Sequence, residues 1–187
     1  MTERKPGRPK TKQVNISSES IISKAIDILS EKGIEQLSMR QIAKEMSITP
    51  MAIYHYFSDK NALIEAIADA LYKDIKLSEG IDARQNIASL LLNYREKVIH
   101  YPQITLAIFN PSMNLPKQAQ NITDILIQQL IQLGLSENQA IKWGYMLIDY
   151  THGEALSVHS NHHSSEKIKL ARLNYHEMIK LLLENIS

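Results

Sequence analysis

The sequence contains no cysteine, which excludes a disulfide framework and any metal site built on thiolates. Glycine and proline are scarce, with six of each in 187 residues, and this favours long uninterrupted helices. No stretch approaches the roughly 18 consecutive apolar residues that a membrane-spanning helix needs. The N-terminus is charged and continues into polar residues, unlike the apolar core of a signal peptide. We therefore expect a cytoplasmic protein with no membrane contact, built as one large domain or two small ones.

Basic residues are concentrated at the N-terminus, although the net charge of the chain is only +1. The first twelve residues contain one acid and five cations, which are Arg4, Lys5, Arg8, Lys10 and Lys12. The prolines and the glycine between them favour an extended chain. The Gly-Arg-Pro sequence at residues 7–9 resembles the core of an AT-hook. We expect residues 1–16 to form a disordered basic arm that enters the minor groove of A·T-rich DNA. The alternative is a solubilising tail, or one that binds phosphates without preference.

Residues 38–65 contain two short helical patterns separated by a tight turn. Ser38 and Gln41 have the spacing of a capping box at the start of the first helix. The pattern breaks at residues 46–48, after which Thr49 is a good N-cap and Pro50 suits the first helical position. A helix, a tight turn and a second short helix can place a recognition helix in the DNA major groove.

The residues after this turn resemble the N-terminal domain of the TetR family of transcriptional regulators. Tyr54, Phe57, Lys60 and Leu63 match that family's pattern, and the resemblance covers residues 18–67. The chain departs from the pattern at Ser47, where the family usually has glycine. Because serine tolerates a left-handed backbone less well than glycine, we expect a strained turn there but the same fold.

The resemblance implies a set of DNA contacts. Phosphate contacts fall to Lys60, Tyr56 and the cap at Thr49, and base contacts to Arg40, Met51, Ala52 and His55. Pro50 and Tyr54 complete the expected surface. The alternatives are that Tyr54 and Tyr56 are packing residues and that Lys60 is a solvated lysine. Ser58 is expected to cap the following helix. The expected core residues of this domain are Ile42, Ala43, Ile48, Ile53, Phe57, Leu63 and Ile67.

Helical periodicity continues through the rest of the chain, and no strand-like alternation persists. The expected helices cover residues 18–32, 59–76, 83–100, 103–109, 117–133, 137–157 and 166–185. Residues 77–82 form a linker. We therefore predict an all-α protein, with a three-helix helix-turn-helix DNA-binding domain at residues 17–76. A larger helical domain for ligand binding and dimerisation would follow at residues 77–187.

Residues 133–163 also resemble the ligand-binding domain of tetracycline-repressor-like members of the family. Several side chains there and in the preceding helices combine apolar bulk with a polar atom, as binding pockets do. The candidate ligand contacts are Tyr94, His100, Phe109, Met113, Trp143, Met146, Tyr150 and His152. For each one, ordinary core packing is the alternative. His159, His162 and His163 lack carboxylates at ligand spacing, so we expect a solvated loop, with no metal and no cofactor.

One face of the helix at residues 137–157 carries small residues, which allow another helix to approach closely. The resemblance implies a four-helix bundle across a two-fold axis, formed by the last two helices of each subunit. The expected dimer contacts are Ala140, Gly144, Leu147, Thr151, Ala155, Tyr175 and Ile179. The alternative is burial of this face within one subunit.

The predicted function is a homodimeric regulator, most often a repressor, that binds a palindromic operator in double-stranded DNA. A small-molecule effector would move the helix at residues 59–76 and so release the DNA. This interpretation gives the chain no catalytic role. The alternative is a helical enzyme that uses His100, His152 or the later histidines with Asp149 or Glu154, although no nucleophile–base spacing supports it.

Overall fold

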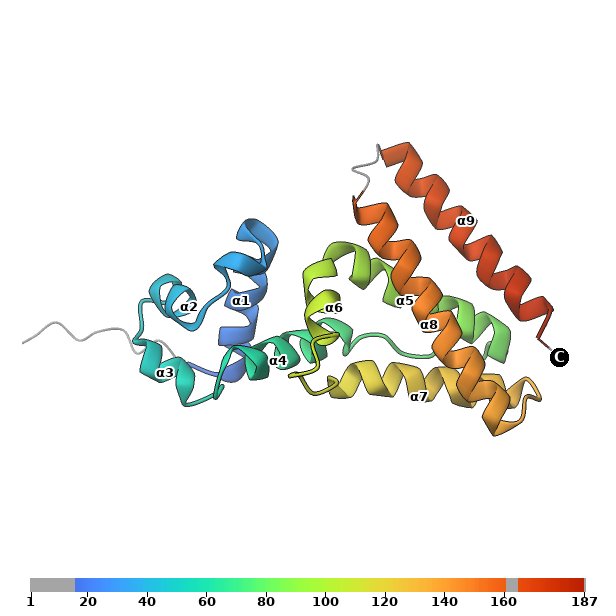
Figure 1. Cartoon of the computed structure of the whole chain (residues 1–187), viewed down its shortest axis with the longest axis horizontal. Coiled ribbons are helices and arrows are strands. Elements are labelled where there is room, and N and C mark those ends of the chain that lie inside the picture. Colours follow the sequence, from blue (N-terminus) through green and yellow to red (C-terminus); the bar gives the residue numbers. More distant parts are fainter. Residues whose placement is uncertain (1–15, 161–164, 187) are drawn as a thin grey trace, which may run out of the picture.

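The computed structural model describes residues 16–160 and 165–186. The described residues form nine α-helices and one short 3-10 helix, with no strand among them. Three short helices gather at one end of the molecule, α4 runs from them into the body, and α5 to α9 form the larger part (Figure 1). The elements are α1 (Ser18–Lys32), η1 (Ile34–Gln36), α2 (Met39–Glu45), α3 (Pro50–Tyr54), α4 (Lys60–Tyr72), α5 (Ala83–His100), α6 (Pro102–Ile108), α7 (Lys117–Gln132), α8 (Glu137–Ser160) and α9 (Ser165–Glu184). The expected all-α architecture is confirmed.

Capping residues set the bounds of α1, which match the prediction. Ser17 and Ser20 cap each other's backbone N–H groups at its start, and Gly33 ends it with φ of 76°. The helix packs against α2 and α4. Every expected core residue of this domain is buried except Ile48, which is half-buried.

The turn between α2 and α3 has the left-handed residue that the sequence predicts. Ser47 has φ of 55°, the only positive value among the described non-glycine residues. Its N–H donates to the Lys44 carbonyl at 3.2 Å, and the Ile48 N–H donates to the Ala43 carbonyl at 2.9 Å. This pair of bonds is a Schellman motif, which satisfies the last carbonyls of α2. The two hydrogen bonds of this turn therefore offset the backbone strain at Ser47.

The start and end of α4 differ from the prediction. Its N-cap is Asp59, whose carboxylate accepts from the Ala62 N–H at 2.9 Å, whereas Ser58 donates to the Asp59 carboxylate at 3.0 Å. A carboxylate is the stronger acceptor for the free N–H groups of a first turn, so the prediction of Ser58 was wrong. The helix ends at Tyr72 rather than near Lys76. It packs against α1 on one side and α5, α6 and α7 on the other, so it joins the two parts of the molecule.

The small-residue face of α8 lies inside the subunit. Ala140, Leu147, Thr151 and Ala155 are fully buried within one chain. A Cβ added at Gly144 would lie 2.9 Å from Cγ1 of Ile127 on α7, so glycine is needed for that helix to approach. Because α5 and α7 of the same chain pack on α8, a partner subunit cannot reach this face.

The inner face of α9 is also buried within the chain. Tyr175 and Ile179 are each only 1% exposed. All seven predicted dimer contacts are therefore internal packing residues: Ala140, Gly144, Leu147, Thr151, Ala155, Tyr175 and Ile179. The periodicity was correct, but it marked the faces that the helices of one chain turn toward each other.

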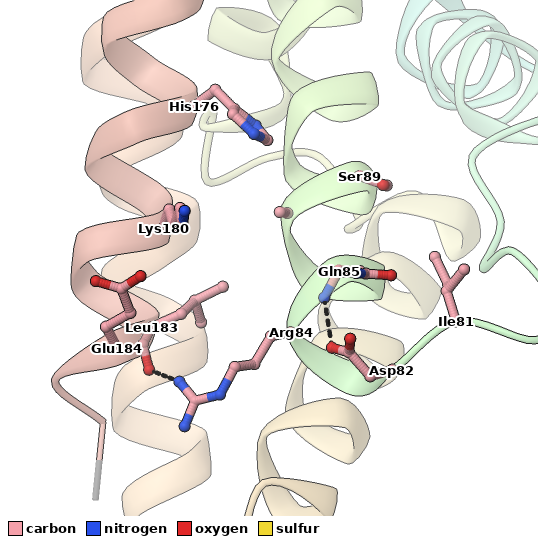
Figure 2. A pocket seen from close by; sticks show the side chains of 10 residues that line it. Ile81, Asp82, Arg84, Gln85, Ser89, His176, Lys180, Leu183 and Glu184 are labelled. Atoms are coloured by element: carbon pink, nitrogen blue, oxygen red, sulfur yellow. Dashed lines mark hydrogen bonds between the residues drawn. The ribbon is translucent and has the colours of Figure 1, made fainter.

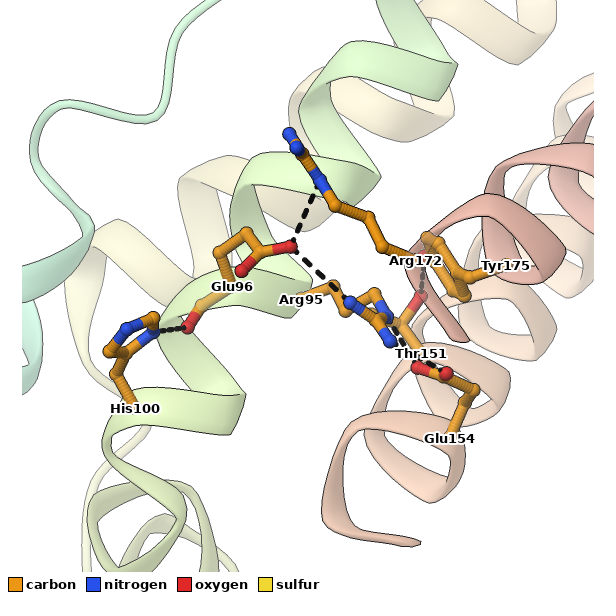
Figure 3. A network of polar contacts seen from close by, with 7 residues as sticks. All are labelled: Arg95, Glu96, His100, Thr151, Glu154, Arg172 and Tyr175. Atoms are coloured by element: carbon orange, nitrogen blue, oxygen red, sulfur yellow. Dashed lines mark hydrogen bonds and ion pairs between the residues drawn. The ribbon is translucent and has the colours of Figure 1, made fainter. Parts of the chain in front are cut away.

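A buried polar network connects α5, α8 and α9 (Figure 3). Arg95 is fully buried and donates twice to Glu154, with Nε–Oε2 at 2.5 Å and Nη2–Oε1 at 2.8 Å. Its guanidinium lies over the ring of Tyr175 at 5.1 Å. The Thr151 hydroxyl donates to the Leu147 carbonyl, so it accepts from Tyr175 at 2.6 Å. The charge of Arg95 is therefore paired with Glu154 of α8, and the face of its guanidinium contacts the Tyr175 ring of α9.

Candidate nucleic-acid interface and effector pocket

The short helix α3 presents an exposed surface beside the turn. The Thr49 hydroxyl accepts from the Ala52 N–H at 3.3 Å, with Pro50 at the first helical position, as predicted. On α3, Ile53 is fully buried, whereas Met51 is 64% exposed. Of the other predicted contact residues, Arg40, Thr49, Pro50, Tyr54, His55, Tyr56 and Lys60 are exposed and Ala52 is half-buried. The surface thus combines hydroxyls, cations and an apolar side chain, which is the mixture that phosphate and base-edge contacts require.

Two of the predicted phosphate contacts already have partners within the chain. The Tyr56 hydroxyl donates to the carbonyl of Ile16, the last residue of the expected arm, at 2.8 Å. Lys60 Nζ donates to the Ile34 carbonyl at 3.2 Å in η1. Both side chains remain exposed, so these bonds hold the groups at the surface without burying them. Arg4, Lys5, Arg8 and Lys10 of the arm lie outside the described residues.

A cavity of about 190 Å³ lies between α5, α6, α7 and α8. It is lined by Tyr94, Thr105, Ile108, Phe109, Leu115, Ala119, Thr123, Tyr145, Ile148, Asp149 and His152. The apolar side chains come from α6, α7, α8 and the segment between α6 and α7, and each of the four helices also contributes at least one polar group. This is the arrangement of a small-molecule site, in which an apolar wall holds the ligand and a few polar groups orient it.

His152 and Tyr94 form the polar centre of this pocket. The Tyr94 hydroxyl and His152 Nε2 are 2.7 Å apart, and the rings meet edge to face with centroids at 5.5 Å. Phe109 meets the same imidazole edge to face at 5.1 Å. Burial lowers the pKa of His152, and the Asp149 carboxylate opposes that shift. His152 Nδ1 is buried without a hydrogen-bond partner. The imidazole is therefore neutral at pH 7, and one of its nitrogens has no partner within the chain.

The pocket is connected to α4 through a chain of buried hydroxyls. Tyr72, the last residue of α4, packs edge to face on Tyr94 with centroids 5.4 Å apart. Its hydroxyl lies 3.4 Å from Oγ1 of Thr105 on α6. Burial raises the pKa of Tyr72, and it raises the pKa of Tyr94 well above the usual value. Both phenols are therefore neutral hydrogen-bonding groups that link the pocket wall to the end of α4.

Three of the eight predicted ligand contacts line the pocket, namely Tyr94, Phe109 and His152. The others lie elsewhere: Trp143 and Tyr150 are about half a turn around α8 from His152, and Tyr150 instead stacks on Tyr175 at 5.8 Å. His100 Nδ1 hydrogen-bonds the Glu96 carbonyl at the surface. The two methionines, Met113 and Met146, are half-buried core packing and exposed surface, respectively. Trp143 and Tyr150 therefore lie outside the lining of this cavity, and their role as ligand contacts stays a prediction.

Among the eight lining residues that sequence reasoning missed are Thr105, Leu115, Thr123, Tyr145 and Asp149. For Tyr145 and Asp149 a signal was present, because they lie seven and three residues before His152 and share its face of α8. The other three come from separate helices and loops, and only their packing brings them to the cavity.

A second cavity of about 540 Å³ lies between the start of α5 and the end of α9. Arg84 extends across it and donates to the Leu183 carbonyl in the last turn of α9 (Figure 2). Asp82 accepts from the Gln85 N–H at 3.0 Å and so caps α5. Arg84 and Asp82, two of the charged residues that line this cavity, therefore bind backbone groups at helix ends.

Two of the groups named in the alternative enzyme hypothesis have other partners within the chain. Glu154 is bound to Arg95, and His159 Nδ1 hydrogen-bonds the Ile99 carbonyl at 3.1 Å. The described residues contain no group of three metal-binding side chains, and His162 and His163 lie outside them. No helix in the described part of the chain is long and apolar enough to cross a membrane.

The fold and this surface define an all-helical protein with a helix-turn-helix domain at its N-terminal end. Residues 21–67 match the family model of bacterial regulatory proteins, tetR family. A curated relative from Bacillus subtilis (strain 168), the uncharacterized HTH-type transcriptional regulator YvdT, is 43% identical over 60 residues. That match covers 32% of this chain and 31% of the relative. Residues 21–67 therefore form a domain of the tetR-family type.

Solved structures extend the likeness to nearly the whole fold. BioQ with its double-stranded DNA operator superposes with a TM-score of 0.71 at 20% identity, covering 89% of this chain and 99% of that one. A TetR variant from Acinetobacter baumannii AYE in complex with minocycline gives a TM-score of 0.73 at 18% identity. Its match covers 90% of this chain and 95% of that chain. At 18–20% identity, these structures show a likeness of fold alone. The match to the curated sequence relative spans less than a third of that relative's length.

Proposed function

We propose that this protein is a homodimeric transcriptional regulator that binds operator DNA through α3 and releases it when a small molecule occupies the α5–α8 pocket. The observation that carries the proposal is the exposed surface of α3 and its flanking residues, in a domain of the TetR family. Solved relatives of the same fold were obtained with an operator and with minocycline, which supports the assignment of one site to each part of the molecule.

The route from the pocket to the DNA runs through α4. The C-terminal residue of α4, Tyr72, packs on the pocket residue Tyr94, and the same helix also packs against α1 of the N-terminal domain. A ligand that displaces Tyr94 or His152 would therefore move the end of α4 and change the separation of the two recognition helices in a dimer. It can do so only if it binds the two arrangements with different affinity.

The test of DNA binding is a retardation assay of the purified full-length protein with fragmented genomic DNA, followed by sequencing of the retained fragments. We expect a palindromic sequence with half-sites about one helical turn apart. Retention of fragments without a shared palindrome would contradict the proposal. A repressor is the expected form, and transcription from the recovered promoter with and without the protein tests the sign of regulation.

Lys60→Ala tests the contribution of one surface cation. Loss of a phosphate contact should weaken binding equally for operator and unrelated DNA and lower the slope of log K against log salt by about 0.9. Lys73→Ala is the matched control, because Lys73 is an exposed lysine just beyond the opposite end of α4. If Lys60→Ala and Lys73→Ala have the same slope as the unmodified protein, Lys60 does not contact DNA.

A further inference from the structure

The charge of the α5–α8 pocket has one sign. Among the residues that line it, Asp149 alone carries a formal charge at neutral pH, because His152 is held in its neutral form by burial. No lysine or arginine lies in the lining. A carboxylate or phosphate ligand would therefore meet a like charge with no cation to compensate it.

The remaining walls favour an apolar body of limited size. Ile108, Leu115, Ala119 and Ile148 provide aliphatic surface, and the rings of Phe109 and Tyr145 are more than half exposed at the edge of the cavity. The volume of about 190 Å³ is below the roughly 300–1,000 Å³ of sites for drug-sized ligands. One aromatic ring or a short branched chain fills such a space.

Two polar groups on α8 line this cavity. Asp149 and His152 are three residues apart and therefore neighbours on one helix face. His152 Nδ1 is buried and lacks a partner, and it becomes an acceptor when Nε2–H donates to the Tyr94 oxygen. Exposed aromatic faces beside a carboxylate also attract cations.

We infer that the pocket binds a small organic cation, namely an amine with an apolar body of about one ring. The ammonium group would lie between the Asp149 carboxylate and the His152 imidazole, with the body against Ile108, Phe109 and Leu115. This inference rests on the proposed function for its biological meaning, since it names the chemical class of the effector.

Three probes with nearly the same body test the charge preference: 2-phenylethylamine, 2-phenylethanol and 3-phenylpropanoate. Binding to the full-length protein is measured by isothermal titration calorimetry. We expect the amine to bind about three- to fivefold more tightly than the alcohol, as a partly exposed ion pair contributes, and the carboxylate to bind weakest. A carboxylate that binds as tightly as the amine overturns the inference, as does a failure of all three probes to bind at millimolar concentration.

Asp149→Asn should abolish the preference for the amine over the alcohol, because it removes the charge and keeps the shape. Asp124→Asn on the exposed side of α7 is the matched control and should preserve the preference. An unchanged preference in Asp149→Asn means that another group selects the cation and that the inference is wrong.

The same samples separate this inference from the proposed function. If the amine binds with the expected preference but leaves operator affinity unchanged, the ligand class stands and the effector role fails. If only the carboxylate releases the operator, the regulator function stands and the ligand class is wrong.

Discussion

Ser47 has a backbone conformation that glycine adopts without steric cost. Its φ of 55° is required by the Schellman motif that ends α2, so the position is fixed by the turn and not by the serine side chain. A left-handed conformation costs a residue with a Cβ roughly 1–2 kcal/mol, part of which glycine loses again through its larger unfolded-state entropy.

Ser47→Gly should therefore raise the free energy of unfolding by about 0.5–1 kcal/mol, measured by urea denaturation. Ser23→Gly in the exposed middle of α1 is the control, and it should lower stability by about 0.5 kcal/mol because helical glycine is unfavourable. Equal losses in both variants would mean that the turn does not store strain at Ser47.

His152 makes stability depend on pH with a defined sign. Its pKa in the fold is below the ordinary value of 6.5 because burial disfavours the charged form. The unfolded chain therefore binds a proton more readily, so the contribution of His152 is complete above about pH 6.5 and is lost as the pH falls through the folded pKa.

The stability of the unmodified protein relative to His152→Phe should thus decrease between about pH 7.5 and about pH 5.5, as measured by urea denaturation at each pH. Because the variant keeps the other histidines, their titration cancels in the difference. A difference that stays constant over this range would indicate that the imidazole is not buried in its neutral form.

Among the helices, α9 is held to the body by the buried Arg95 network as well as by apolar packing. Arg95 is fully buried and the partner Glu154 is its main counter-charge, whereas Glu96 lies nearer the surface and also pairs with Arg172 at 3.3 Å. Removing one member of a buried pair leaves a charge without compensation, which costs far more than the pair itself contributes.

Glu154→Gln should lower the free energy of unfolding by about 3 kcal/mol, whereas Glu96→Gln should lower it by less than about 1 kcal/mol. Urea denaturation monitored by circular dichroism measures both variants against the unmodified protein. Similar losses for the two substitutions would show that Arg95 does not depend on Glu154.

The helices themselves were predictable because their signals are local. Ser17, Thr49 and Gly33 act within a turn of their own position, and the bounds of α1, α5 and α7 follow the expected ranges to within one residue. The end of α4 was not predictable in this way. Apolar and polar residues continue past Tyr72 with helical spacing, although the helix ends there with Lys73 as its C-cap.

The candidate pocket was only partly predictable. Tyr94 and His152 are on different helices, 58 residues apart in the chain, and only the packing of α5 on α8 brings them to 2.7 Å. The periodicity of α8 identified its buried face correctly, but it could not distinguish a face covered by α7 of the same chain from one covered by a partner. The position of Gly144 against Ile127 resolves that choice in favour of the same chain.

At the scale of the whole molecule, the outer face of α9 carries several exposed apolar side chains. Leu170, Leu173 and Leu181 are 56%, 53% and 52% exposed, and Met178 is 40% exposed. The three leucines lie on the side of the helix opposite Tyr175 and Ile179, which pack inward. The proposed regulator needs a two-fold dimer to read a palindrome, and exposed apolar side chains of this kind are what such an interface buries.

The double substitution Leu173→Arg and Leu181→Arg should therefore produce monomers, because dimerisation would bury two unpaired cations of each subunit away from water. The core residues of α9 are untouched, so circular dichroism should report an unchanged helical content. Gln128→Arg on the exposed side of α7 is the control for added charge and should leave the dimer intact. Sedimentation velocity distinguishes the two forms. If the double variant remains a dimer, the two-fold axis lies on another surface. Operator affinity, measured in parallel, should fall if monomers form, because a monomer has only one recognition helix, and should stay unchanged if the dimer persists.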